Sequence, residues 1–121
     1  MKFIFLIVLS IIFLTSCYYD KAQLVYPATG TCDTTNATYS LKVVPIINAN
    51  CNACHSGAAT AGAGIKLDTY AGIKTYVTNG QLLNSINQTG VVPAMPLSAA
   101  KLSACEISQI TAWINAGALN N

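Results

Sequence analysis

Five of the 121 residues are cysteine, and their positions constrain the fold more than any other feature of the sequence. The length suits one domain of ordinary size. Apolar periodicity starts near Tyr39, which leaves about 80 residues to build a hydrophobic core. A core of that size usually needs disulfides, a metal ion or a large cofactor for stability. We therefore expect the cysteines to provide such support.

The start of the chain predicts export. Met1-Lys2 carries a positive charge, and residues 3–14 form an almost unbroken apolar run. This run is shorter than the ~20 residues of a membrane-spanning helix, but it matches the core of a signal peptide. Leu14-Thr15-Ser16-Cys17 resembles a bacterial lipobox, which implies cleavage before Cys17 and attachment of lipid to that cysteine. A plain secretory signal that happens to precede Cys17 is the alternative.

These features predict three parts of the chain: a signal peptide in residues 1–16, a lipid-attached leader in 17–39 and a domain in 40–121. The leader contains Pro27, Gly30 and threonine clusters without a helical period, so we expect an extended tether. The mature protein would be a lipoprotein of the cell envelope, anchored to a membrane on its periplasmic or outer-surface side. Such a compartment permits disulfides.

The charge pattern argues against nucleic acid as a partner. Only 8% of the residues are charged, and the formal net charge is +2. The positive charges are lysines scattered singly along the chain, and no arginine is present. Proteins that bind nucleic acids concentrate positive charge in a patch or stripe.

Apolar spacing predicts an all-α domain without strands. A first helix is expected to lead to Cys51, with Pro45 in its first turn, where proline is tolerated. The expected apolar residues of this helix are Leu41, Val44, Ile46 and Ile47.

Further helices are predicted from apolar spacing and from their end signals. Asp68 is the predicted N-cap of a second helix that ends at Asn79-Gly80. The last helix begins with Ser103-Ala104-Cys105-Glu106, which has the form of a capping box, and Gly117 is expected to end it. The apolar residues of the later helices are Tyr70, Ile73 and Val77; Leu82, Leu83 and Ile86; and Ile107, Ile110 and Ile114.

Cys51-Asn52-Ala53-Cys54-His55 has the C-x-x-C-H form that attaches c-type haem. Two thiols at this spacing can form thioethers with the two vinyl groups on one edge of a porphyrin. His55 is then held beneath the ring, where its Nε2 can bind the iron. One covalent haem c would also complete the core of a small exported domain.

The motif has three other interpretations. A thioredoxin-like redox pair would follow a strand in a βαβ unit, and no such unit is visible. A zinc site could combine Cys51 and Cys54 with Cys32 and Cys105, but those outer spacings match no common zinc pattern. The third interpretation is a chance match.

Met95 is the expected second ligand of the iron. His55 is the only histidine, so two-histidine ligation within one molecule is impossible. Met95 is the only methionine after residue 1, and it lies in a loop stiffened by Pro93 and Pro96. Ligation by histidine and methionine raises the reduction potential relative to two nitrogen ligands. The alternative role of Met95 is a flexible core filler.

With these features the chain resembles a small monohaem cytochrome c of the class I type. More narrowly, it is similar to haem-binding lipoproteins of the Bacteroidetes group. The resemblance covers roughly residues 32–118 and implies a bundle of three to five short helices in which the first and last pack across each other, with the haem between them and the Met95 loop. The motifs that carry it are Cys32-Asp33, the haem motif followed by Ser56-Gly57, Met95-Pro96 and Trp113-Ile114-Asn115-Ala116-Gly117.

The expected function is one-electron transfer between redox partner proteins in the cell envelope, and no residue is assigned acid–base or nucleophilic catalysis. The alternatives are a haem-based sensor or gas-binding domain, and a haem-bearing subunit of a larger redox enzyme. Cys32 and Cys105 are expected to form a disulfide, with two free thiols or pairing to another chain as alternatives. Trp113 is expected to fill the core. The side chains near the haem propionates stay open among Lys66, Lys74, Tyr70, Tyr76 and asparagines.

Overall fold

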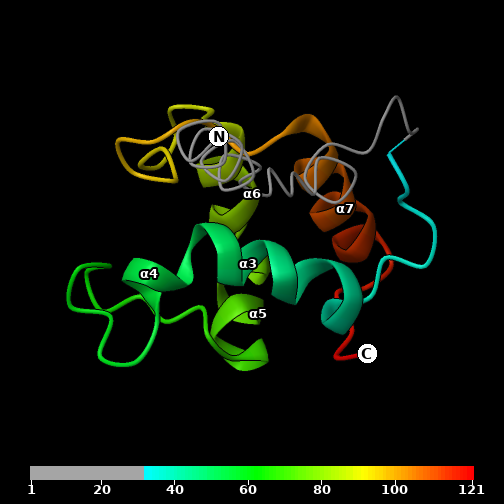
Figure 1. Ribbon diagram of the computed structural model, residues 1–121, viewed down its shortest axis with the longest axis horizontal. Coiled ribbons are helices and arrows are strands. Elements are labelled where there is room, and N and C mark those ends of the chain that lie inside the picture. The colour runs from blue at the N-terminus through cyan, green and yellow to red at the C-terminus, as the bar shows by residue number, and fades with distance from the viewer. Residues whose placement is uncertain (1–31) are drawn as a thin grey trace, which may run out of the picture. The chain divides into compact units, whose positions relative to one another are not determined.

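A computed structural model of the protein describes residues 32–121, so the predicted signal peptide and Cys17 lie outside the described residues. The described residues form helices and no strand, as the all-α prediction requires (Figure 1). Within this part of the chain, no helix has the length and hydropathy to cross a membrane. The elements are a π-helix η1 (Tyr39–Val43) and the α-helices α3 (Val44–Asn50), α4 (Asn52–His55), α5 (Tyr70–Thr78), α6 (Gln81–Asn87) and α7 (Ala104–Asn115).

The predicted first helix is present as η1 and α3, which run into each other. Thr38 caps its start by accepting a hydrogen bond from the Leu41 amide, and Pro45 lies in the first turn of α3, as expected. The assignment of Leu41 to the apolar face is wrong, because 70% of Leu41 is exposed, whereas Val43 is fully buried. The amide of Val44 donates to the carbonyl of Tyr39, five residues back. This wider turn shifts the buried face relative to a regular 3.6-residue period.

The second predicted helix is α5, and its N-cap differs from the prediction. Thr69, not Asp68, caps α5, because the Thr69 side chain accepts a hydrogen bond from the Gly72 amide. The Asp68 carboxylate instead accepts a hydrogen bond of 2.9 Å from the amide of Gly57. Asp68 therefore holds the loop between α4 and α5, while α5 ends at Thr78 with Asn79 as its C-cap, at the predicted stop Asn79-Gly80.

The last helix, α7, has both of its predicted end structures. Ser103 and Glu106 form the complete capping box at its start. At its end, the Gly117 amide donates to Ile114 and the Ala118 amide donates to Trp113, with Gly117 at φ +100°. This pair of bonds is a Schellman motif, in which glycine provides the positive φ. The spacing of Leu82 and Ile86 likewise identifies α6, where both are buried.

The core lies between η1, α3 and the three later helices. Helix α7 packs against η1 and α6, and α6 packs against α5. Trp113 is buried near the centre, where its ring lies 5.8 Å from that of Tyr39 and its Nε1 donates to the Leu119 carbonyl. Trp113 thus fills the core, as expected. The buried core residues are Val43, Ile46, Ile47, Leu67, Ile73, Leu82, Ile86, Leu102, Ile110, Trp113 and Ala118.

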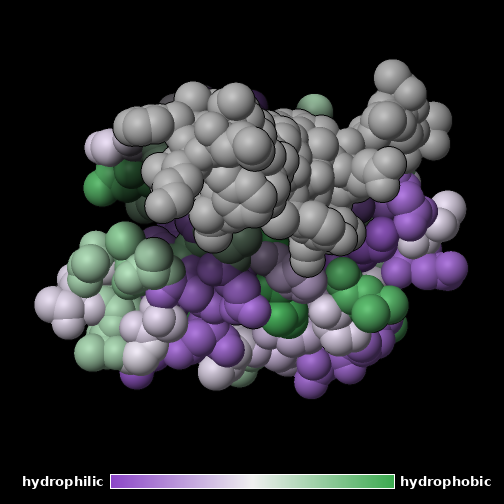
Figure 2. All heavy atoms as spheres, in the orientation of Figure 1, coloured by the Kyte–Doolittle hydropathy of each residue, from purple (hydrophilic) through white to green (hydrophobic). Residues whose placement is uncertain are grey.

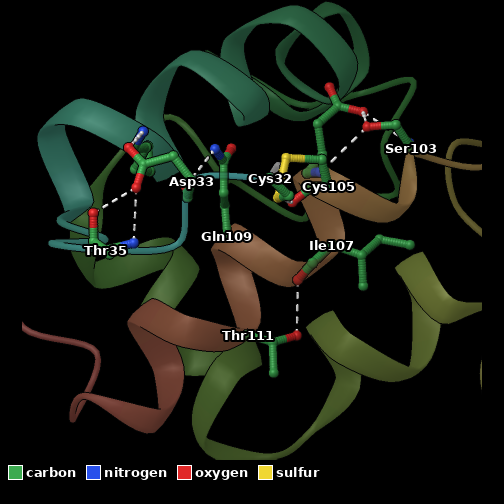
Figure 3. The surroundings of a disulfide bond; sticks show 10 residues. Cys32, Asp33, Thr35, Ser103, Cys105, Ile107, Gln109 and Thr111 are labelled. Atoms are coloured by element: carbon green, nitrogen blue, oxygen red, sulfur yellow. Dashed lines mark hydrogen bonds and ion pairs between the residues drawn. A yellow bond between two sulfur atoms is a disulfide. The ribbon is translucent and has the colours of Figure 1, made fainter. Parts of the chain in front are cut away.

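The segment before η1 is held on the domain by its first residues (Figure 3). Cys32 and Cys105 form the expected disulfide, with their Cα atoms 5.3 Å apart. Asp33 forms an ion pair of 3.0 Å with Lys42, and its carbonyl accepts a hydrogen bond from Gln109. Residues 32–39, which the sequence assigns to the leader, therefore lie against the helices.

Candidate functional site

A cavity of about 410 Å³ brings together the four residues that the sequence assigns to haem. Cys51, Cys54, His55 and Met95 all line it. The walls come from the junction of α3 and α4, the loop 56–69, helices α5 and α6, and the loop 88–103. Most of the lining side chains are apolar, among them Ile65, Leu67, Leu82 and Ile86, and none is charged.

The junction of α3 and α4 positions both cysteines of the motif. The Cys51 amide donates to the Ile47 carbonyl at the end of α3, and the Cys51 carbonyl accepts from the amides of Cys54 and His55 in α4. Cys51 is half-buried and Cys54 is exposed, and both are free thiols. One helical turn thus carries two unpaired thiols and the histidine to the same cavity.

The environment of Cys51 does not favour a thioredoxin-like redox pair. Burial, together with the nearby Glu106 carboxylate, raises the pKa of the Cys51 thiol to about 11. Redox-active thiols have a lowered pKa because the thiolate is the reacting form. Cys51 is therefore a protonated thiol at neutral pH.

The zinc interpretation that combined all four cysteines is wrong. Cys32 and Cys105 are bonded to each other, so neither can bind a metal ion as a thiolate. In residues 32–121, no group of three or more histidine, cysteine or acidic side chains is arranged to hold a metal ion.

His55 is held in one orientation and one tautomer. Its ring is buried, with 8% of the residue exposed, and Nδ1 lies 3.0 Å from the carbonyl oxygen of Ile65. Because a carbonyl can only accept, Nδ1 carries a proton, and in the neutral imidazole Nε2 keeps its lone pair. A neutral imidazole with a free Nε2 and a hydrogen-bonded Nδ1 is the form in which histidine binds metals.

Met95 reaches the cavity from the loop between α6 and α7. It is half-buried, and its amide donates a hydrogen bond of 3.1 Å to the Ser85 carbonyl of α6. The peptide bond between Met95 and Pro96 is cis. The loop is thus tied to α6 at the methionine itself.

Of the side chains that the sequence offers near the haem propionates, some line the cavity and others do not. Tyr76 lines the cavity. The Tyr70 hydroxyl donates to the Ala118 carbonyl, and the Lys74 ammonium donates to the carbonyls of Gly117 and Ala118, so both serve the end of α7. Lys66 is not part of the lining.

Two contributors to the site were not identified from the sequence. The Ile65 carbonyl is a backbone group, so the identity of residue 65 does not indicate that it accepts the hydrogen bond from His55. Gly62 lies against the imidazole of His55, and the glycine-rich stretch Gly57–Gly64 is the only sequence signal of a close approach there. The glycines predict an unusual loop conformation, but they do not indicate which residue the loop contacts.

The residues present fit a covalently attached haem. Two free thiols at the required spacing, a histidine with its Nε2 lone pair free and a methionine thioether share one largely apolar cavity. Comparison of the chain with protein-family models, with curated proteins and with solved structures found no match in any of the three.

Proposed function

We propose that this protein is a monohaem c-type cytochrome that carries single electrons between redox partner proteins of the cell envelope. One observation carries the proposal: Cys51, Cys54, His55 and Met95, which span 45 positions of the sequence, line one apolar cavity. A chance C-x-x-C-H would have no reason to share a cavity with the only methionine after residue 1.

Each residue has a separate task in the proposed site. Cys51 and Cys54 would hold the haem by thioethers, and His55 and Met95 would bind its iron. When bound, the haem supplies a reversible one-electron change between ferric and ferrous iron. The apolar walls would exclude water, and the hydrogen bond from Nδ1 to the Ile65 carbonyl would keep Nε2 of His55 directed at the iron.

Two iron ligands from the protein would leave no open position for a substrate. We therefore assign electron transfer rather than catalysis, and no residue is given an acid–base role. The proposed attachment of lipid to Cys17 would keep the carrier at a membrane, on the side where its partners lie.

Mass spectrometry of the full chain, extracted from membranes, tests the proposal directly. The expected mass is that of residues 17–121 plus one haem and one lipid group, less two hydrogens for the disulfide. The Cys51→Ser/Cys54→Ser double variant is the control, because it should lose the haem mass and keep the lipid mass. A wild-type protein without covalent haem would overturn the proposal.

A reduced-minus-oxidised spectrum separates the carrier from a gas-binding domain. The carrier should be low-spin in the ferrous state and should not take up CO while Met95 is intact. Ready uptake of CO by the wild type would favour a sensor. Co-purification with an oxidase or dehydrogenase would identify the chain as a haem-bearing subunit.

A further inference from the structure

The loop between α4 and α5 folds back on the histidine that α4 carries. The Leu67 amide donates to the His55 carbonyl at 2.7 Å, and the Gly57 amide donates to Asp68. Within the loop, the carbonyl of the buried Ala59 accepts from the amides of Gly62 and Gly64. The backbone of this loop is therefore fixed by hydrogen bonds at both of its ends and in its middle.

One turn of this loop, Gly62–Ile65, touches the imidazole with both of its ends. The Ile65 amide donates to the Gly62 carbonyl at 3.0 Å, which closes the turn. Its two central residues, Ala63 and Gly64, have φ of +55° and +76°. The Ile65 carbonyl then accepts the Nδ1 proton of His55.

Gly62 approaches the same nitrogen from its Cα side. A methyl group on Gly62 would lie 2.5 Å from His55 Nδ1, 2.9 Å from His55 Cε1 and 2.6 Å from the Cys54 carbonyl oxygen. Side-chain carbon atoms essentially never come this close, so the ring or the turn would have to move. Movement of the ring or of the turn alone would change the hydrogen bond between Nδ1 and the Ile65 carbonyl.

The surroundings show that the lack of a side chain matters at Gly62 and not at every glycine of the loop. Gly57 and Gly64 have positive φ, and a methyl group on either would have no atom within 4 Å. Gly62 has no positive φ, so alanine there is strained only by contact with its neighbours. Contacts with the His55 ring and with the Cys54 carbonyl are thus the reason for glycine at this position.

We propose that Gly62 is the positioning residue of His55, because its missing side chain lets the Gly62–Ile65 turn close on the imidazole and set the orientation of Nε2. This inference rests on the proposed role of His55 as an iron ligand. The hydrogen bond from Nδ1 raises the basicity of the imidazole, which favours ferric over ferrous iron. Weakening that bond should therefore favour the reduced protein.

The test is a redox titration of the haem-loaded full chain with Gly62→Ala, with Gly57→Ala and Gly90→Ala as controls. Both control glycines have positive φ and open surroundings, so alanine there strains the backbone without touching His55. Gly62→Ala should shift the reduction equilibrium threefold to tenfold towards the ferrous form, which is about 30–60 mV for one electron. Its ferric electron paramagnetic resonance spectrum should also change. An unchanged reduction potential in Gly62→Ala, or an equal shift of the potential in Gly62→Ala and both control variants, would overturn the proposal.

A measurement on the wild type covers the case in which Gly62→Ala does not fold or load haem. In the ferrous protein, nuclear magnetic resonance should show a strong Overhauser effect between the Gly62 α-protons and the ε1 proton of His55, the only histidine. Absence of this effect would refute the contact.

Failure of the proposed function is separately visible. If the purified wild type carries no haem, the imidazole signals of the haem-free chain still report the tautomer of His55. Gly62→Ala should then lose the Nδ1–H tautomer and Gly57→Ala should keep it. The same tautomer in both variants would overturn the role of Gly62, whatever His55 binds.

Discussion

Cys32 and Cys105 lie 73 positions apart in the sequence and are joined by a disulfide at the first turn of α7. The bond adds to three polar contacts in the same region. Asp33 contacts Lys42 and its carbonyl accepts a hydrogen bond from Gln109 (Figure 3). The third contact is the hydrogen bond from Asn50 to Glu106. The start of the described chain is thus fixed to the helix that closes the core.

Removal of this disulfide should destabilise the domain. The Cys32→Ser/Cys105→Ser variant is expected to lose about 2–4 kcal/mol of unfolding free energy, because the bond closes a long loop in the unfolded chain. Urea unfolding of the haem-loaded protein measures the loss. The wild type under reducing conditions should unfold at the same urea concentration as the variant. Equal stability of variant and oxidised wild type would contradict the prediction.

The Asp33 carboxylate should make stability depend on pH in the acid range. Hydrogen bonds from Thr35, and the hydrogen bond and charge of Lys42, lower the pKa of Asp33 from 3.8 to about 2. A lowered pKa contributes stability above the unfolded value, and this contribution is lost as the pH falls from about 4 to about 2. Urea midpoints measured across this range should fall less steeply in Asp33→Asn than in the wild type.

Glu106 adds a second acid-sensitive contact and serves as the control. Partial burial acts to raise its pKa, but hydrogen bonds from Ser103 and Asn50 outweigh this and lower the pKa. Its contribution is therefore also lost as the pH falls through the carboxylate range. Asp33→Asn should keep this part of the pH dependence, and Asp33→Asn/Glu106→Gln should lose both. If the stability of Asp33→Asn alone no longer depended on pH in this range, the assignment of the pH dependence to two carboxylates would be contradicted.

Met95 can be tested against a neighbour in the same loop. Met95→Ala should open one position on the iron, so the ferrous protein takes up CO and the potential falls by at least about 60 mV, a tenfold change for one electron. Leu97→Ala is the matched control, because Leu97 also lines the cavity but has no ligand atom. CO difference spectra and a redox titration measure both effects. No change in Met95→Ala, or the same change in Leu97→Ala, would remove Met95 as a ligand.

The register of the first helix gives a prediction that does not depend on haem. Val43→Ala should cost about 2 kcal/mol of unfolding free energy, since Val43 is fully buried. Leu41→Ala should change it by less than about 0.5 kcal/mol, because 70% of Leu41 is exposed. A larger loss of unfolding free energy in Leu41→Ala than in Val43→Ala would contradict the π-helical register and favour a regular α-helical one.

These two residues also show where sequence reasoning stops. Within residues 32–121, apolar spacing located every helix except the single turn α4, and the capping residues of α7 were predicted because S-x-x-E is a local signal. The exposed Leu41 was not predicted, since a π-helical turn changes the period and no residue type announces it. Asp68 and Thr69 are both good N-caps, and only the fold shows that Gly57 takes the Asp68 carboxylate.

The residues of the cavity also fall into those that the sequence predicts and those that it does not. Cysteine spacing and the scarcity of histidine and methionine were sufficient to select Cys51, Cys54, His55 and Met95 before any fold was known. The support for His55 could not be predicted, because one part is a backbone carbonyl and the other is an absent side chain. Figure 2 shows mostly pale green and white surface at the left of the view, where the loop between α4 and α5 lies, so its hydropathy alone indicates only a weakly apolar loop.

The disulfide would also limit how far the domain could travel from a membrane. If Cys17 carries the lipid and the leader is extended as predicted, the tether ends at Cys32 and spans at most about 50 Å. If the bridge and the contacts of Asp33 were both lost, the tether would continue to Tyr39, where η1 begins, and the same estimate gives about 75 Å. The volume that the domain could explore grows with the cube of this radius, so release of residues 32–39 would dilute the domain roughly threefold around its anchor. A bond that stabilises the fold would thus also confine electron exchange to partners close to the membrane.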